Sequence, residues 1–154
     1  MRTESKRPRL TIDTNNVLRA ILTPGNASHR LMTAWQQGQF QWILTQPTFE
    51  ELTLVLNRDR FRVKYGFQTE TITQLLATIA EAAEFVTPLP LAALPVHSRD
   101  IKDDILLACA FGGDCDYLVS EDEDLLVLAS DSALGRLKIV NAHALLATLS
   151  QEMP

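Results

Sequence analysis

Short runs of strand-forming residues alternate along this chain with longer segments whose apolar residues have helical spacing. The strand-like runs are RLTID (9–13), FQWILT (40–45), YLVS (117–120) and LKIV (137–140). Each run is followed by a segment with a helical pattern, and strands connected in this way form a parallel sheet with helices on both faces. The alternation therefore predicts an α/β fold, namely a Rossmann-like three-layer α/β/α sandwich with a central parallel sheet.

The predicted helices occupy residues 14–22, 29–38, 47–57, 72–83, 103–112, 122–129 and 141–149. Ser28 is the predicted N-cap of the second helix, and Asn141 is that of the last. Pro47 fits the first turn of the third helix, and Gly112 ends the fifth. Prolines between residues 84 and 95 favour an extended or looped segment there.

At 154 residues the chain has the length of one domain with a substantial core. We expect a flexible basic tail at residues 1–8 and a single domain at residues 9–150. No apolar run approaches the roughly 18 residues of a membrane span, and no apolar segment of signal-peptide length follows the N-terminus. Cys109 and Cys115 form no CxxC pair, so we expect reduced thiols in a cytoplasmic protein.

Charge is distributed unevenly between the two parts of the chain. Residues 1–64 carry ten Lys and Arg against five Asp and Glu, whereas residues 65–154 carry four against fourteen. Patchy charge is common on protein surfaces, but this division also suits a protein that binds a polyanion with one region and cations with another. The net charge of −5 argues mildly against tight nonspecific binding of nucleic acid.

Acidic residues gather where the predicted strands end or the following helices begin. They are Asp13, Asp103, Asp104, Asp122 and Asp124, with Glu50 and Glu51 in the helix after the second strand. In a parallel sheet these positions share one edge, which is where ligands bind. Massed carboxylates repel one another, and a divalent cation removes that conflict. Oxygen ligands favour Mg²⁺ or Mn²⁺, since the three histidines are too scattered for a zinc site.

Each acid also has a simpler interpretation when it is considered alone. Aspartate at the start of a helix is a common N-cap, and acids in a first turn interact favourably with the helix dipole. Glu50 and Glu51 are equally typical of a solvated helix face. The joint placement of the acids, rather than any single residue, favours a metal site.

Four segments of the chain resemble a known family. IDTNNVLRAIL, TFEELTLVL, RDIKDDILLACA and DYLVSEDEDLLVL, in this order, are similar to the motifs of PIN-domain ribonucleases, and closest to bacterial toxins of toxin–antitoxin pairs. The similarity covers residues 9–149. It implies a PIN-like domain that cleaves RNA with one or two Mg²⁺ or Mn²⁺ ions held by its acids.

The resemblance also assigns roles to individual residues. It implies catalytic acids at Asp13, Glu51, Asp103 and Asp122, metal ligands at Asp13, Asp103, Asp104, Asp122 and Asp124, and supporting residues at Asn15 and Ser120. Asp103 and Asp104 both fit the third acidic position and remain alternatives. Three features depart from the family pattern: the polar Asn16 in the first helix, Ile101 and Lys102 in place of Pro–Asp, and Glu121 where glycine is common.

Basic residues outside the acidic edge are candidates for binding RNA. Arg58, Arg60, Arg62 and Lys64, with Tyr65 beside them, form the best local group, and the Arg2, Lys6, Arg7 and Arg9 tail is second. A solvated helix end explains the first group equally well. The resemblance implies a homodimer and a small antitoxin as partners, although the apolar stripe in residues 72–83 is more typical of core packing than of a dimer face.

Two functions of other classes also fit the acids. One is a Mg²⁺-dependent phosphatase or phosphotransfer domain with Asp13 as nucleophile, although DTNN lacks the DxD pattern usual in phosphatases. The other is a non-catalytic acidic module that binds a partner or an ion. Loss of RNA cleavage in a folded Asp13→Asn or Asp103→Asn variant would distinguish the nuclease from both.

Overall fold

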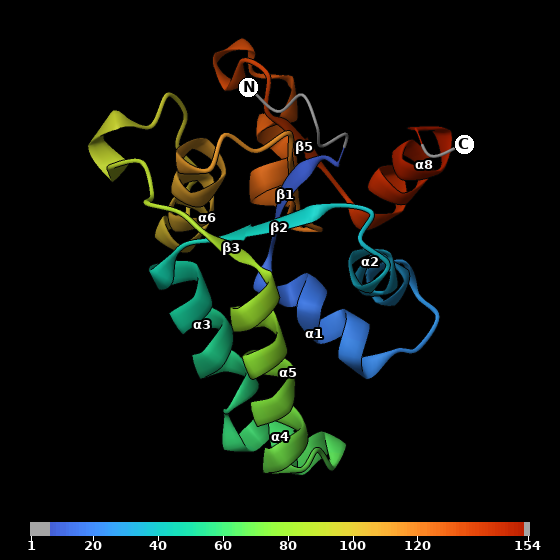
Figure 1. The fold of residues 1–154 in the computed structure, drawn as a ribbon. Coiled ribbons are helices and arrows are strands. Elements are labelled where there is room, and N and C mark those ends of the chain that lie inside the picture. Colours follow the sequence, from blue (N-terminus) through green and yellow to red (C-terminus); the bar gives the residue numbers. More distant parts are fainter. Residues whose placement is uncertain (1–6, 153–154) are drawn as a thin grey trace.

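A computed structural model describes residues 7–152, and its centre is a five-stranded parallel sheet (Figure 1). The strands are β1 (Arg9–Ile12), β2 (Gln41–Leu44), β3 (Glu84–Phe85), β4 (Tyr117–Val119) and β5 (Lys138–Val140). Their order in the sheet is β3-β2-β1-β4-β5, and every neighbouring pair is parallel. The predicted parallel sheet is confirmed.

Helices cover both faces of this sheet. They are α1 (Thr14–Leu22), α2 (Ala27–Gln36), α3 (Gln46–Leu56), α4 (Asp59–Tyr65), α5 (Thr69–Ala82), α6 (Ile101–Gly112), α7 (Glu123–Leu126) and α8 (Ala142–Glu152). The apolar residues form two separate cores, one involving α1, α2, α3, α5 and α8, and the other involving α6 and α7. The chain is therefore the predicted three-layer α/β/α sandwich.

Alternation along the strands explains why there are two cores. In β1, Leu10 and Ile12 pack into the first core, while the side chain of Thr11 lies 3.4 Å from the Cys109 sulfur of α6. In β2, Trp42 belongs to the first core and Ile43 to the second. Successive side chains of a strand point to opposite faces, so a strand covered on both sides is apolar nearly throughout.

Several predicted boundaries differ from those in the structure. Asn26, rather than Ser28, caps α2, because its carboxamide oxygen accepts a hydrogen bond from the His29 N–H at 2.8 Å. The segment predicted as extended or looped contains the two-residue strand β3. Helix α6 begins at Ile101 with Asp100 as its cap, two residues before the predicted start.

Other predictions concern the tail, the apolar stripe and the cysteines. Residues 1–6 of the predicted tail lie outside the described residues. The apolar stripe of α5, with Ile72 and Ile79 buried, packs into the core of this chain, in agreement with core packing. Cys109 and Cys115 are free, buried thiols whose pKa burial raises. Among the described helices, none is both long and apolar enough to cross a membrane.

Candidate metal and nuclease site

Asp13 lies where β1 ends and α1 begins, at the carboxyl edge of the sheet. Its side chain caps α1, with Oδ1 accepting a hydrogen bond from the Asn15 backbone N–H at 3.2 Å. The other oxygen, Oδ2, accepts a 2.7 Å hydrogen bond from the Ser120 hydroxyl. Burial raises the pKa of Asp13, the two hydrogen bonds oppose this rise, and the carboxylates of Asp122 and Glu121 add to it.

Ser120 connects this first acid to the segment that follows β4. Its hydroxyl oxygen, which donates to Asp13, accepts a hydrogen bond from the Asp122 backbone N–H at 3.0 Å. Asp122 in turn caps α7, and its Oδ1 accepts from the Asp124 backbone N–H at 2.9 Å. Asp13 and Asp122 are thus both helix caps, as the simpler interpretation predicts. The cap uses only one carboxylate oxygen of Asp122 and leaves the other available to a ligand.

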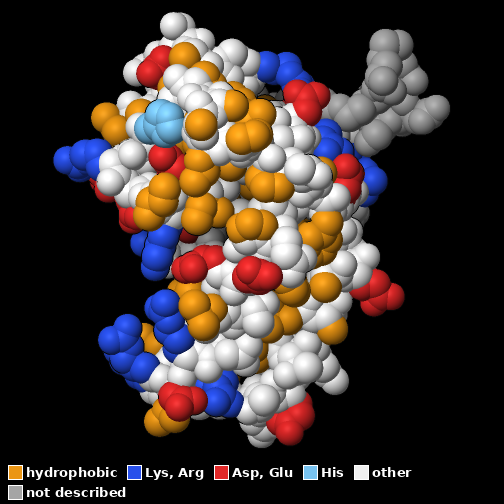
Figure 2. Space-filling model, turned by 90° about the vertical axis from the view of Figure 1, so that its left-hand side faces the viewer, with side chains coloured by type: hydrophobic (Ala, Val, Ile, Leu, Met, Phe, Trp, Pro, Cys, Tyr) orange, Lys and Arg blue, Asp and Glu red, His pale blue; other side chains and the backbone are white. Residues whose placement is uncertain are grey.

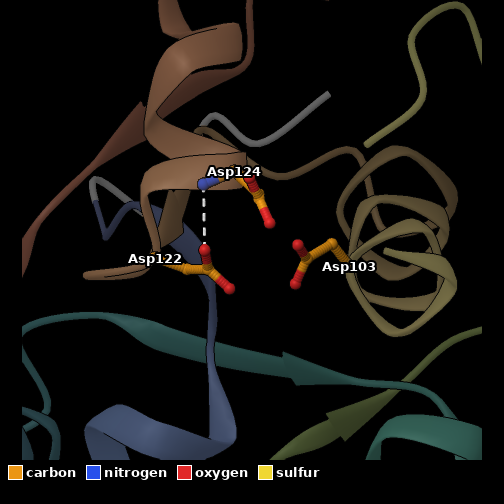
Figure 3. A group of neighbouring side chains, drawn as sticks. All are labelled: Asp103, Asp122 and Asp124. Carbon is orange, nitrogen blue, oxygen red and sulfur yellow. Dashed lines mark hydrogen bonds between the residues drawn. The ribbon is translucent and has the colours of Figure 1, made fainter. Parts of the chain in front are cut away.

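Three carboxylates from two distant segments meet beside this network (Figure 3). One oxygen each from Asp103, Asp122 and Asp124 lies within 4.8 Å of the others. Asp103 extends from the first turn of α6, Asp122 and Asp124 come from the loop and helix after β4, and the three groups point toward one another. Asp103 lies nineteen positions before Asp122 in the sequence, and the fold brings it and the two later aspartates within reach of one small ion.

Asp103 is a buried carboxyl group with other carboxylates close by. Burial raises its pKa to about 6, and the carboxylates of Asp122, Asp100 and Asp13 contribute to the rise, while a hydrogen bond from Ser98 opposes it. A divalent cation would relieve both the desolvation and the repulsion. The donors are all carboxylate oxygens, which fits Mg²⁺ or Mn²⁺ and does not favour zinc.

Asp104, although it is adjacent to Asp103 and equally buried, has a different role. Its Oδ1 accepts a 2.7 Å hydrogen bond from the Ser98 backbone N–H, and its Oδ2 lies 2.9 Å from His97 Nδ1. Both oxygens are thus used to hold the loop that leads into α6. The geometry points to Asp103 as the third acid of the cluster and to Asp104 as a structural residue.

A cavity of about 690 Å³ opens beside the acids. Its lining includes Asp13, Asp103 and Asp122 together with Asn15 and Glu51. Glu51, on α3, also lines this cavity, and it lies outside the group of three converging carboxylates. The structure therefore brings the four predicted catalytic acids to one cavity, with Glu51 in a more peripheral position.

The predicted RNA-binding group is divided by the structure. Arg58 and Arg60, which lie between α3 and α4 and at the start of α4, line the cavity. Arg62 forms an ion pair with Asp59 at 2.9 Å, and Lys64 lies over a neighbouring tyrosine ring, 5.4 Å from its centroid. Only the first two arginines are therefore placed beside the acids.

The second predicted basic group does not face the acidic edge. Arg9 starts β1, and its guanidinium forms a 2.9 Å ion pair with Glu84 at the amino-terminal edge of the sheet. Arg7 donates to a glutamine of β2. Arg2 and Lys6 lie outside the described residues.

Two basic residues contact the acids and were not among the predicted site residues. Arg99 binds Asp124, with Nη2 2.6 Å from Oδ1. The Lys102 ammonium lies 3.9 Å from Glu51 Oε1. The sequence SRD (98–100) before the helical run is typical of a helix start and could have indicated them. A helix that starts there places Arg99 and Lys102 near the aspartates of its first turn.

Two of the departures from the family pattern form a pair. Asn16, fully buried in α1, donates one 2.9 Å hydrogen bond to Glu121 Oε2 and another of 3.1 Å to the Ser28 hydroxyl. The same Glu121 oxygen accepts from the Ala142 backbone N–H at the start of α8. The amide group of Asn16 and the carboxylate of Glu121 thus bind each other and connect the loop carrying Asp122 to α1 and α8.

The raised pKa of Asp103 predicts a pH dependence of stability in the absence of metal. A carboxyl whose pKa is raised from 3.8 to about 6 on folding lowers the stability of the folded protein as pH rises between these values, because only the unfolded chain loses the proton there, and the loss is complete above about pH 6. Asp103→Asn should therefore unfold like the wild type near pH 4 and be more stable by about 1 kcal/mol at pH 7.5, after allowance for solvent screening. Thermal unfolding in EDTA between pH 4 and 8 measures this difference, and a difference independent of pH would contradict it.

Comparison with known proteins agrees with the fold. A family model described as a PIN domain matches residues 9–124, a range that contains the five aspartates of the predicted site and Glu51. A crystal structure of PAE2754 from Pyrobaculum aerophilum superposes with a TM-score of 0.58 at 13% identity, covering 94% of this chain and 96% of that one. A search of curated protein sequences gave no match.

Proposed function

The chain belongs to the PIN domain family, and on this premise we propose that it is a divalent-metal-dependent endoribonuclease. PIN domains are generally metal-dependent nucleases, so hydrolysis of a nucleic acid is the activity to expect of the site. The observation that carries the proposal is the convergence of Asp103, Asp122 and Asp124 on one point at the carboxyl edge of the sheet. Three carboxylates held this close repel one another, and a bound divalent cation would remove that repulsion.

The proposed roles follow from the position of each residue. Asp103, Asp122 and Asp124 would hold Mg²⁺ or Mn²⁺, with Asp13 beside them and Glu51 across the cavity. A bound divalent cation supplies an activated water for attack on phosphorus and charge compensation for the phosphate. Ser120 keeps the orientation of Asp13 and of the Asp122 loop through its two hydrogen bonds.

Substrate binding is assigned to the basic residues at the cavity. Arg58 and Arg60 reach it from the α3–α4 side and are positioned to bind phosphates next to the one that is cleaved. The acids alone would repel RNA, so cations and arginines together are needed for binding.

Incubation of the purified protein with total RNA tests the proposal. We expect cleavage with Mn²⁺ or Mg²⁺, none in EDTA, and a loss of at least about a hundredfold in Asp122→Asn. Asp131→Asn is the matched control, because Asp131 is also a helix-capping aspartate but lies away from the cavity. Cleavage by Asp122→Asn at the wild-type rate would contradict the proposal, and a phosphorylated Asp13 would instead indicate phosphotransfer.

The cellular role is a further part of the proposal and rests on the resemblance to bacterial toxins. We propose that the protein acts in the cytoplasm as the toxin of a type II pair, forms a homodimer and is neutralised by a small antitoxin. Growth arrest on expression of the wild type, absent with Asp122→Asn, would support the toxin role. Light scattering of the purified protein gives the mass that tests the dimer.

A further inference from the structure

Two exposed cations, Arg99 and Lys102, are held by acids of the site. Arg99 binds Asp124 through both Nε, at 3.2 Å, and Nη2, at 2.6 Å. Lys102 lies 3.9 Å from Glu51 on the other side of the cavity. The two side chains are 89% and 63% exposed, so solvent surrounds most of each and little packing restrains them.

These cations come from a different part of the chain from the predicted RNA-binding arginines, and Lys102 lines the same cavity as Arg58 and Arg60. Arg99 and Lys102 belong to the start of α6, whereas Arg58 and Arg60 belong to the region between α3 and α4. In Figure 2, Lys and Arg side chains occur both above and below the notch on the left-hand side of the molecule. A nucleic-acid strand that crosses the acids would therefore meet basic residues on both walls.

The excess of acids in the cavity indicates that Arg99 and Lys102 are free to bind phosphate only when metal is bound. Six acids and three bases line it, a formal charge of −3 when all are ionised. Without metal, Asp124 and Glu51 have only Arg99 and Lys102 as the counter-ions that the structure describes for them. A divalent cation among Asp103, Asp122 and Asp124 would replace Arg99 at Asp124, and a second one near Glu51 would replace Lys102, since a small dication at short range interacts more strongly with carboxylates than an exposed side chain does.

We propose that Arg99 and Lys102 form a second phosphate-binding wall, which a divalent cation releases from Asp124 and Glu51 so that it can bind the RNA backbone. This inference rests on the proposed nuclease function and deepens it. Arg99 and Lys102 are counter-ions of the acids in the metal-free protein and phosphate ligands in the metal-bound protein. Lys102 stands where an acid is common in the family, and it adds a base to the lining of the cavity.

Binding of a fluorescein-labelled single-stranded RNA, measured by anisotropy with and without Mg²⁺, tests the proposal. The Arg99→Gln/Lys102→Gln double variant should bind about tenfold more weakly than the wild type in Mg²⁺ and by a clearly smaller factor in EDTA, because the two side chains bind phosphate only when the metal has released them. Lys138→Gln, an exposed lysine at the start of β5, is the control and should leave binding unchanged. Binding is read directly after mixing, before cleavage proceeds, and gel analysis of each quenched sample checks that the RNA was still intact.

Calorimetric titration with Mn²⁺ in the absence of RNA should show stronger binding of the metal by the variant, whereas the RNA experiment should show weaker binding of RNA. Arg99→Gln should bind Mn²⁺ about two- to fivefold more tightly, because a competing counter-ion is removed. Unchanged or weaker Mn²⁺ binding, or RNA binding that falls equally with and without Mg²⁺, would overturn the inference. If the RNA is bound in this metal-dependent way but never cleaved, the phosphate-binding role of Arg99 and Lys102 is supported and the nuclease proposal fails.

Discussion

Asp103→Asn is expected to lower the rate of RNA cleavage by about a thousandfold while the protein stays folded. The substitution keeps the size of the side chain and leaves an oxygen to accept the Ser98 hydrogen bond, but it removes one of the three charges that converge on the cation. Cleavage of a labelled RNA at saturating Mn²⁺ measures the loss. Thermal unfolding without metal, where the variant should equal or exceed the wild type in stability, shows that the loss is not due to unfolding.

Asp104→Asn is the matched control for this prediction. Its oxygens bind the Ser98 N–H and the exposed His97 ring, and an amide in place of the carboxylate would weaken these hydrogen bonds by removing the charge. We expect a loss of about 1 kcal/mol in the free energy of unfolding and a fall in activity of less than about tenfold. The reverse pattern, with activity lost in Asp104→Asn and kept in Asp103→Asn, would assign the third acid to Asp104.

Asn16→Asp is expected to destabilise the protein by about 3–5 kcal/mol, a large effect for a substitution of one atom. Asn16 is 1% exposed and its amide donates to Glu121. Aspartate would place a second carboxylate against that of Glu121, in a site with no cation among the described residues that contact it. Chemical denaturation at pH 7.5 measures the free energy of unfolding.

A double substitution separates charge repulsion from lost packing. Glu121→Gln in the Asn16→Asp background restores a donor opposite the new carboxylate and should recover at least half of the lost stability. Glu121→Gln alone should cost about 1 kcal/mol, since its amide oxygen still accepts from Asn16 or from the start of α8. A double variant as unstable as the sum of the single ones would mean that the Asn16–Glu121 contact does not support the fold.

The parallel sheet could be predicted because its signal is local. Each strand shows a short β-favouring run, and the segments between them are long enough for the crossover helices that parallel strands require. The two-residue β3 has no such signal, since Glu84 and Phe85 are both exposed and form a strand only by pairing with Ile43 and Leu44. Asn26 and Ser28 are both good caps, and the choice between them depends on where the turn before α2 ends.

The acids could be predicted because the ends of parallel strands lie at one edge, so that position in the sequence implies proximity. The choice between Asp103 and Asp104 could not be made, since adjacent helical residues point about 100° apart and the sequence does not fix the rotation of the helix. The Asn16–Glu121 bond joins residues 105 positions apart. Neither residue implies its partner until the register of β1 against β4 is known.

Anomalous diffraction from crystals soaked in Mn²⁺ tests most directly whether the acids form one metal site. We expect a manganese peak bounded by the carboxylates of Asp103, Asp122 and Asp124, with ligand distances of about 2.0–2.4 Å. Crystals of Asp103→Asn, soaked in the same way, should lose or greatly weaken this peak. A fully soaked wild-type crystal with no manganese among these carboxylates, or with the three side chains turned apart, would contradict the account.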